Sequence, residues 1–146
     1  MKGKILVIED DPIWQDDLKE FLELDGFHVD VVGDIESALK IIEMQMFHFV
    51  TLDMRLDKLS KENLLAVDFE GWDILGLIKK IRLEQITPVM VVTSFAEDYE
   101  RLKPLKKLES FFYMEKRPFM KKEFLEIINR EVARIDLRFK NDFRSN

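Results

Sequence analysis

The sequence of 146 residues predicts an α/β fold, in which helices cover both faces of a parallel sheet. Short apolar runs rich in β-branched residues alternate with segments whose apolar residues recur at helical spacing. The composition, 47% hydrophobic and 36% charged with five glycines and four prolines, excludes collagen-like, low-complexity and disordered chains. The length suits one domain.

The first unit begins with an apolar run over residues 5–8, which predicts a strand buried on both faces. Asp11 and Pro12 follow as a helix N-cap and a proline at the first helical position. Apolar residues then recur at helical spacing until Gly26, where the first helix is expected to end.

The same alternation continues along the chain. Further strands are predicted over residues 27–32, 47–52, 88–92 and 111–114. Further helices are predicted from Asp34 to about residue 42, over about 71–83 and 97–107, and after Pro118. These elements make five βα units, so the sheet is expected to be parallel.

Two segments are longer than such a fold requires. Residues 54–70 follow the third strand, where connections usually have about 2–6 residues, so this segment is either functional or holds a small helix. The final helix carries an apolar stripe longer than the usual helix of about 11 or 12 residues. The stripe consists of Phe124, Ile128, Val132, Ile135 and Phe139. It either packs on the domain's own sheet or, as we slightly favour, meets a second copy of the chain or a partner helix.

Charge is divided unevenly along the chain, whose formal net charge is -6. Residues 1–100 hold 10 basic and 22 acidic side chains, whereas residues 101–146 hold 13 and 7. Arg130, Arg134 and Arg138 recur every four residues and therefore lie along one side of the final helix. This row indicates an acidic protein surface as partner rather than nucleic acid.

The chain contains no cysteine, which excludes disulfides, zinc-thiolate sites, iron–sulfur clusters and thiol nucleophiles and suits a reducing compartment. No stretch approaches 18 uncharged apolar residues, and the N-terminus lacks the apolar region of a secretion signal. We therefore expect a cytoplasmic protein that does not contact a membrane.

Polar residues follow several of the predicted strands, at the sheet edge where open α/β folds bind ligands. Glu9 and Asp10 follow the first strand and Asp53 follows the third. If those strands are neighbours, three carboxylates meet at one edge, and Mg²⁺ prefers such oxygen ligands together with retained waters. The sequence therefore predicts a magnesium site.

A carboxylate beside a metal ion can act as a nucleophile toward phosphorus and form an aspartyl phosphate. The cation would neutralise charge on the phosphoryl oxygens. The hydroxyl of Thr93 and the ammonium of Lys116, which follow the fourth and fifth strands, would act as hydrogen-bond donors to the remaining oxygens.

With these residues in this order, the chain resembles a response-regulator receiver domain, the phospho-accepting module of two-component signalling. The resemblance covers about residues 3–133 and rests on residues 5–12, 49–53, 88–94, 113–116 and 118–119. It implies a flavodoxin-like, doubly wound, five-stranded parallel sheet in the order 2-1-3-4-5, with helices on both faces. The final helix departs from the family by overrunning the usual domain end by about ten residues, so we expect an extended C-terminal helix. Residues 1–133 would then form the receiver domain and residues 134–146 a helical extension.

The resemblance also implies a role for each site residue. Asp53 matches the phosphoacceptor, Glu9 and Asp10 match the acidic pair that holds Mg²⁺ together with Asp53, Thr93 matches the switch hydroxyl, and Tyr113 matches the switch aromatic residue.

Two further positions complete the implied site. The backbone carbonyl of Arg55, two residues past the phosphoacceptor, would also bind the metal. The family's Lys-Pro pair is interrupted by Arg117. Aligning on Pro118 therefore puts Arg117 in the lysine position, whereas aligning on Tyr113 selects Lys116, which we favour.

The function that the resemblance implies is a phosphorylation switch, in which a sensor histidine kinase or phosphotransfer protein modifies Asp53 and a protein-interaction surface changes. Such a module is not an enzyme in the usual sense, although it can catalyse its own phosphorylation and slow dephosphorylation. One alternative is a receiver that is never phosphorylated and acts as a constitutive interaction module, with Arg55 or the 54–70 segment in the pocket.

Another alternative is a phosphohydrolase of the haloacid dehalogenase type, but Arg55 stands where those enzymes usually have a second acid. The cognate kinase and the output stay open, as does whether the chain is a stand-alone receiver or a fragment.

Overall fold

The computed structural model describes residues 2–53, 80–81, 87–94 and 110–144, with side chains described as far as residue 135. Five strands form one parallel sheet in the order β2-β1-β3-β4-β5. They are β1 (Lys4–Glu9), β2 (His28–Val32), β3 (Phe49–Asp53), β4 (Val89–Thr93) and β5 (Phe111–Glu115). The predicted fold class and strand order are confirmed.

The described helices are α1 (Pro12–Leu24), α2 (Ile35–Met44) and α6 (Lys121–Arg144). Asp11 caps α1 by accepting a hydrogen bond from the backbone N–H of Ile13 at 2.9 Å, and Asp34 caps α2 in the same way. The segment at 54–70 and the helix predicted over 97–107 lie outside the described residues. Of the helix predicted over 71–83, Lys80 and Ile81 are described, and both are helical.

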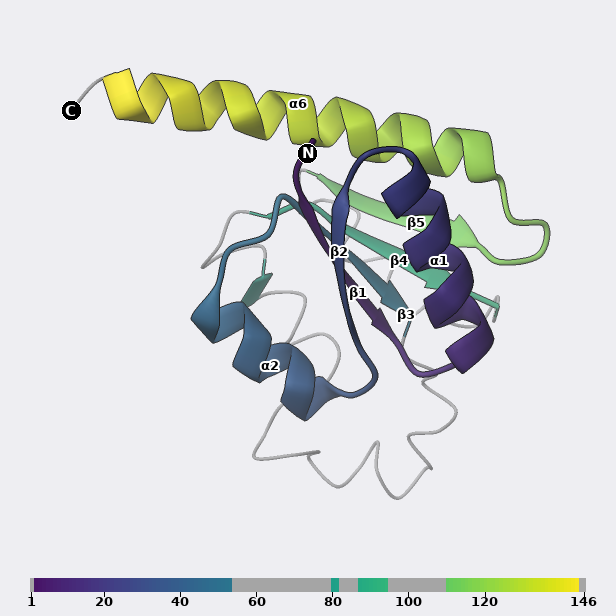
Figure 1. Ribbon diagram of the computed structural model, residues 1–146. Helices are drawn as coiled ribbons and strands as arrows, with labels where there is room; N and C mark the ends of the chain where they lie inside the picture. The colour runs from purple at the N-terminus through teal and green to yellow at the C-terminus, as the bar shows by residue number, and fades with distance from the viewer. Residues whose placement is uncertain (1, 54–79, 82–86, 95–109, 145–146) are drawn as a thin grey trace.

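The helices lie on both faces of the sheet, and each face has its own core. Figure 1 shows α1 and α6 together on one face and α2 on the other. Alternate residues of each strand point to opposite faces, so Val7 packs with α1 and α6 whereas Leu6 and Ile8 pack with α2. This two-sided burial explains why residues 5–8 are apolar without interruption.

The apolar stripe of α6 packs largely on the domain's own sheet. Phe124, Ile128 and Val132 are buried in the same core as α1, and Ile135 is half-buried. The side chain of Phe139 lies outside the described part. The stripe therefore belongs to the core at least as far as Val132, and Figure 1 shows the last turns of α6 running past the edge of the sheet.

Two arginines of the predicted row contact an acid of their own helix. Glu131 is buried, and its carboxylate lies 3.3 Å from Nη1 of Arg134 and 3.7 Å from Nε of Arg130. The Oγ of Ser110 also donates to Glu131, which links α6 to the residue preceding β5. Both arginine side chains are still more than half exposed, so the row stays accessible at these positions.

Within the part of the chain that the structure describes, no helix combines the length and the apolar character needed to cross a bilayer.

Candidate metal and phosphoryl site

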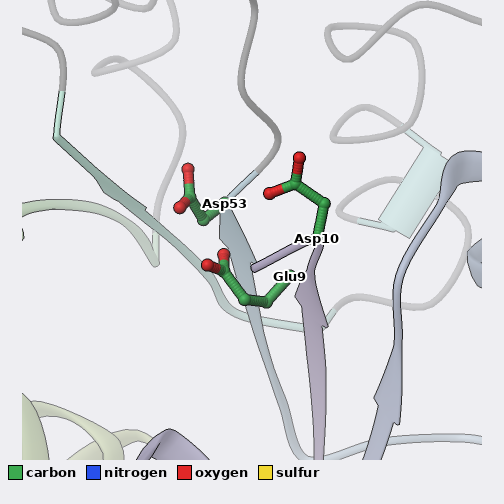
Figure 2. A group of neighbouring side chains, drawn as sticks. All are labelled: Glu9, Asp10 and Asp53. Carbon is green, nitrogen blue, oxygen red and sulfur yellow. The ribbon is translucent and has the colours of Figure 1, made fainter. Parts of the chain in front are cut away.

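Three carboxylates gather at the carboxyl edge of the sheet. β1 and β3 are hydrogen-bonded neighbours whose register places Glu9 beside Asp53, and Asp10 follows Glu9 directly. One carboxylate oxygen from each of the three residues lies within 4.8 Å of the other two. Figure 2 shows the three side chains projecting from the ends of these two strands toward a common space.

The three acidic side chains of the cluster are largely shielded from solvent. Glu9 and Asp53 are 1% and 4% exposed, and Asp10 is half-buried. Burial, together with the hydrogen bond and charge of Asp53, raises the pKa of Glu9 from 4.5 to about 8, even though Lys116 acts in the opposite direction. In the metal-free protein the carboxyl group of Glu9 therefore keeps its proton at neutral pH, whereas an ordinary carboxyl group has lost it.

Lys116 supplies a positive charge inside the cluster. Its Nζ donates to Oε1 of Glu9 at 2.7 Å and to Oδ2 of Asp53, and its side chain is 3% exposed. The backbone brings it there, because the N–H of Lys116 donates to the carbonyl of Thr93 at 2.9 Å and so extends the pairing of β4 and β5 by one residue.

The two predicted switch residues lie on the neighbouring strands. Thr93 is the last residue of β4, is buried, and stands at the same carboxyl edge as the acids. Tyr113 is a half-buried residue in the middle of β5, where it helps to line a groove of about 430 Å³.

The remaining residues that the sequence singled out differ in their exposure and in their contacts with the site. Arg117 is exposed, whereas Lys116 makes the carboxylate contacts, so the geometry favours Lys116 for the lysine position. Ser94 is exposed beside the buried Thr93. Arg55 lies outside the described residues.

Two residues in the first turn of α1 contact site residues in a way that the sequence pattern alone does not specify. The ring of Trp14 packs against the core and also lies against the Lys116 ammonium, 4.6 Å from Nζ to the ring centroid. Gln15 donates from Nε2 to the backbone carbonyl of Glu9 at 2.6 Å, which fixes the turn between β1 and α1. Their position a few residues after the acidic pair, at the start of the helix that follows it, was the available signal.

The residues present fit a magnesium ion. Oε2 of Glu9 and Oδ1 of Asp53 are buried and have no hydrogen-bond partner among the described residues. Buried carboxylate oxygens in this state are costly, and a divalent cation would satisfy them. The donor set consists of oxygens alone, as Mg²⁺ prefers, and two or three protein carboxylates leave positions for water and substrate.

The chain belongs to the response regulator receiver domain family, whose model matches residues 5–129. The fold and the position of the acidic cluster at the carboxyl edge agree with this membership.

Curated proteins similar to the chain include transcriptional regulators. The chain is 31% identical over 99 residues to the transcriptional activator protein PfeR of Pseudomonas aeruginosa, a match that covers 68% of this chain and 28% of PfeR. It spans between 28% and 66% of the lengths of six curated relatives that it matches.

Solved structures of receivers superpose on most of the chain. A two-component response regulator from Clostridium difficile is 25% identical with a TM-score of 0.68, covering 90% of this chain and 97% of that one. The receiver domain of sensor histidine kinase PA1611 from Pseudomonas aeruginosa is 24% identical with a TM-score of 0.66, over 90% and 98% of the two chains. That structure holds a magnesium ion in its active-site cleft.

Proposed function

We propose that this receiver accepts a phosphoryl group on Asp53, in a Mg²⁺-dependent reaction, from a sensor histidine kinase or a phosphotransfer protein. The observation that carries the proposal is the cluster of three carboxylates, two of which accept hydrogen bonds from the buried ammonium of Lys116. Family membership and the magnesium ion in the PA1611 receiver support it.

Glu9, Asp10 and Asp53 would hold the metal ion, together with the backbone carbonyl of Arg55. When bound, Mg²⁺ would supply positive charge against the phosphoryl oxygens. The cost of holding three carboxylates in a buried site is thus offset when substrate and metal arrive together.

In the transfer itself, a carboxylate oxygen of Asp53 attacks the phosphorus atom of a phosphohistidine. An O–P bond forms, the P–N bond breaks, and the departing imidazole nitrogen keeps the electron pair of that bond. Oδ1 of Asp53, which has no hydrogen-bond partner within the described part, is the better candidate because Oδ2 accepts from Lys116.

Lys116 and Thr93 would respond to the new group. The ammonium of Lys116 would exchange a carboxylate oxygen for a phosphoryl oxygen, and the hydroxyl of Thr93 would donate to another. Tyr113 would change rotamer as Thr93 moves inward, and the surface formed by β5 and the start of α6 would change with it.

We further propose that residues 1–133 act as the receiver and residues 134–146 as a helical extension. The exposed arginines Arg130 and Arg134 suit an acidic protein surface or a second copy of the chain, with no direct role for nucleic acid or membrane. The absence of cysteine and the membership in two-component signalling support a cytoplasmic location.

Intact-mass measurement after incubation with acetyl phosphate and Mg²⁺ tests the proposal. The wild-type protein is expected to gain one phosphoryl mass, and Asp53→Asn and wild type in excess EDTA are expected to gain none. Asp30→Asn serves as the matched control, because this carboxylate lies on β2 and pairs with His28. A wild-type protein that stays unmodified would sink the proposal.

The alternative of a constitutive, unphosphorylated module predicts a different response to the metal. A Trp72→Phe variant leaves Trp14 as the single tryptophan, and its ring contacts the Lys116 ammonium. Saturable quenching or enhancement of Trp14 fluorescence by Mg²⁺ supports the phosphorylation switch, whereas no response supports the constitutive module. The described site residues carry no sign of degeneration.

A further inference from the structure

Trp14 contacts the functional lysine through its aromatic face. Lys116 Nζ lies 4.6 Å from the centroid of the Trp14 ring, within the range of about 6 Å in which a cation is attracted to an indole. Because the lysine side chain is 3% exposed, water does not screen this attraction strongly.

Three side chains surround the ammonium of Lys116. An ammonium has three N–H donors, and two of them are directed to Oε1 of Glu9 and Oδ2 of Asp53. The Trp14 ring faces the same nitrogen. The cation is therefore enclosed by two carboxylates and one aromatic face.

The position of the Trp14 ring is fixed independently of the lysine. Trp14 meets Phe119 edge to face with centroids 5.3 Å apart, and Phe119 in turn packs against Phe124 at 5.2 Å and Phe21 at 6.1 Å. A ring already held by an aromatic neighbour can hold the ammonium in place without losing much side-chain entropy itself.

A bound metal ion would compete for the carboxylates but not for the indole. Mg²⁺ prefers hard oxygen ligands, so the carboxylates of Glu9 and Asp53 would bind the ion and contact Lys116 less closely. An indole carbon surface is no ligand for Mg²⁺, so the attraction of the ring for the ammonium persists. The ring then keeps the ammonium beside the position that a phosphoryl group on Asp53 would occupy.

We propose that Trp14 is a positioning residue, which holds the Lys116 ammonium at the site once Mg²⁺ has taken the carboxylates. The proposal rests on the proposed function for its effect on rate. Its geometric part, that the ammonium stays against the ring when Mg²⁺ binds, can be tested without any phosphoryl transfer.

The rate test compares three residues at position 14 at saturating acetyl phosphate and Mg²⁺. Trp14→Leu is expected to lower the phosphorylation rate by about 2- to 30-fold, because a cation–π contact is worth about 0.5–2 kcal/mol. Trp14→Phe keeps an aromatic face and is expected to restore most of the rate. The Mg²⁺ concentration for half-maximal rate is expected to change little, since Trp14 is not a metal ligand.

Two controls separate positioning from a general loss of structure. In a Lys116→Met background, Trp14→Leu is expected to cause no further loss of rate, because the partner of the ring is gone. Phe27→Leu removes a ring that carries the Lys2 ammonium at 5.4 Å and that precedes β2, at the opposite end of the strands from the acids, so it should leave the rate unchanged. Equal slowing by Trp14→Leu with and without Lys116 would overturn the inference.

The geometric test uses nuclear magnetic resonance without a phosphodonor. The ε-methylene protons of Lys116, assigned with Lys116→Met, are expected to be shifted upfield by the Trp14 ring and to stay so at saturating Mg²⁺. Trp14→Leu is expected to abolish the shift. If Mg²⁺ alone abolishes it in wild type, the inference is wrong, even if Asp53 is phosphorylated. If the shift persists but Asp53 gains no mass, the proposed function is what fails.

Discussion

Replacing Glu9 with glutamine is expected to stabilise the metal-free protein, and the gain is expected to grow with pH. Burial, supported by the hydrogen bond and charge of Asp53, raises the pKa of Glu9 from 4.5 to about 8 in the folded protein. Between these two values the unfolded chain has lost the proton that the folded chain keeps. The free energy of unfolding therefore falls as pH rises through this window.

The magnitude follows from the size of the pKa shift. Each unit corresponds to about 1.4 kcal/mol, so Glu9 costs the metal-free fold on the order of 5 kcal/mol at pH 8 and above, and about 3 kcal/mol near pH 7. Below about pH 4.5 both states hold the proton and the cost disappears. Glu9→Gln mimics the protonated acid and removes this dependence.

Urea unfolding followed by circular dichroism, in EDTA and between about pH 5 and pH 8, measures the effect. The difference between Glu9→Gln and wild type isolates this group from other groups that titrate. Glu36→Gln, which removes an exposed carboxylate paired with Lys40 on α2, provides the control and should show no pH-dependent gain.

Mg²⁺ should reduce the advantage of the variant. At ten times its dissociation constant, the ion is expected to add about 1.4 kcal/mol to the wild type and less to Glu9→Gln. The reasoning is refuted if Glu9→Gln is no more stable than wild type at pH 8 in EDTA, or if its gain does not shrink toward pH 5.

Two further substitutions test the site and the core. Lys116→Met leaves Glu9 and Asp53 without the cation that they share. The free energy of unfolding of the metal-free protein, measured with urea near pH 8, should therefore fall by about 3–5 kcal/mol. A fall of less than about 1 kcal/mol would contradict the buried ion pairs. Phe124→Ala removes a fully buried ring from α6 and should cost about 3–5 kcal/mol, whereas Met120→Ala, at a side chain 52% exposed, should change stability by less than about 0.5 kcal/mol. Equal effects of these two variants on the urea midpoint would show that α6 does not pack as described.

Most of the fold could be predicted because local chemistry and tertiary structure agree. Asp11 followed by Pro12 marks the start of α1, and the cap hydrogen bond to Ile13 is present. Strand boundaries were less accurate, because the first strand was expected over residues 5–8 and extends over Lys4–Glu9. Backbone pairing with β2 and β3 continues past the apolar run, and a hydrophobic pattern does not report pairing.

The fate of the α6 stripe shows the limit of periodicity. Phe124, Ile128 and Val132 fit a partner helix and the domain's own sheet equally well by spacing, and the structure places them in the core with α1. Sequence spacing states which residues share a face of a helix. It does not state what that face meets.

The proximity of two site residues could be predicted because it depends only on which strands are neighbours in the sheet. Glu9 and Asp53 end strands that pair in parallel, so their proximity follows from topology. Spacing favoured Lys116 over Arg117 only when the chain was aligned on Tyr113 rather than on Pro118, because the outcome depends on which backbone N–H continues the β4–β5 ladder. That N–H belongs to Lys116, and its partner is the carbonyl of Thr93.

The part of α6 that extends beyond the sheet would convert a small tilt of the anchored part into a larger displacement of the helix end. The helix is anchored in the core as far as Val132 and continues to Arg144, a length of about 18 Å at 1.5 Å per residue. A tilt of about 5° at the anchored part would move the far end by roughly 1.5 Å. Because the first turn of α6 lies next to Phe119, which packs on Trp14 beside Lys116, a sub-ångström change at the site would be amplified at the end of the helix.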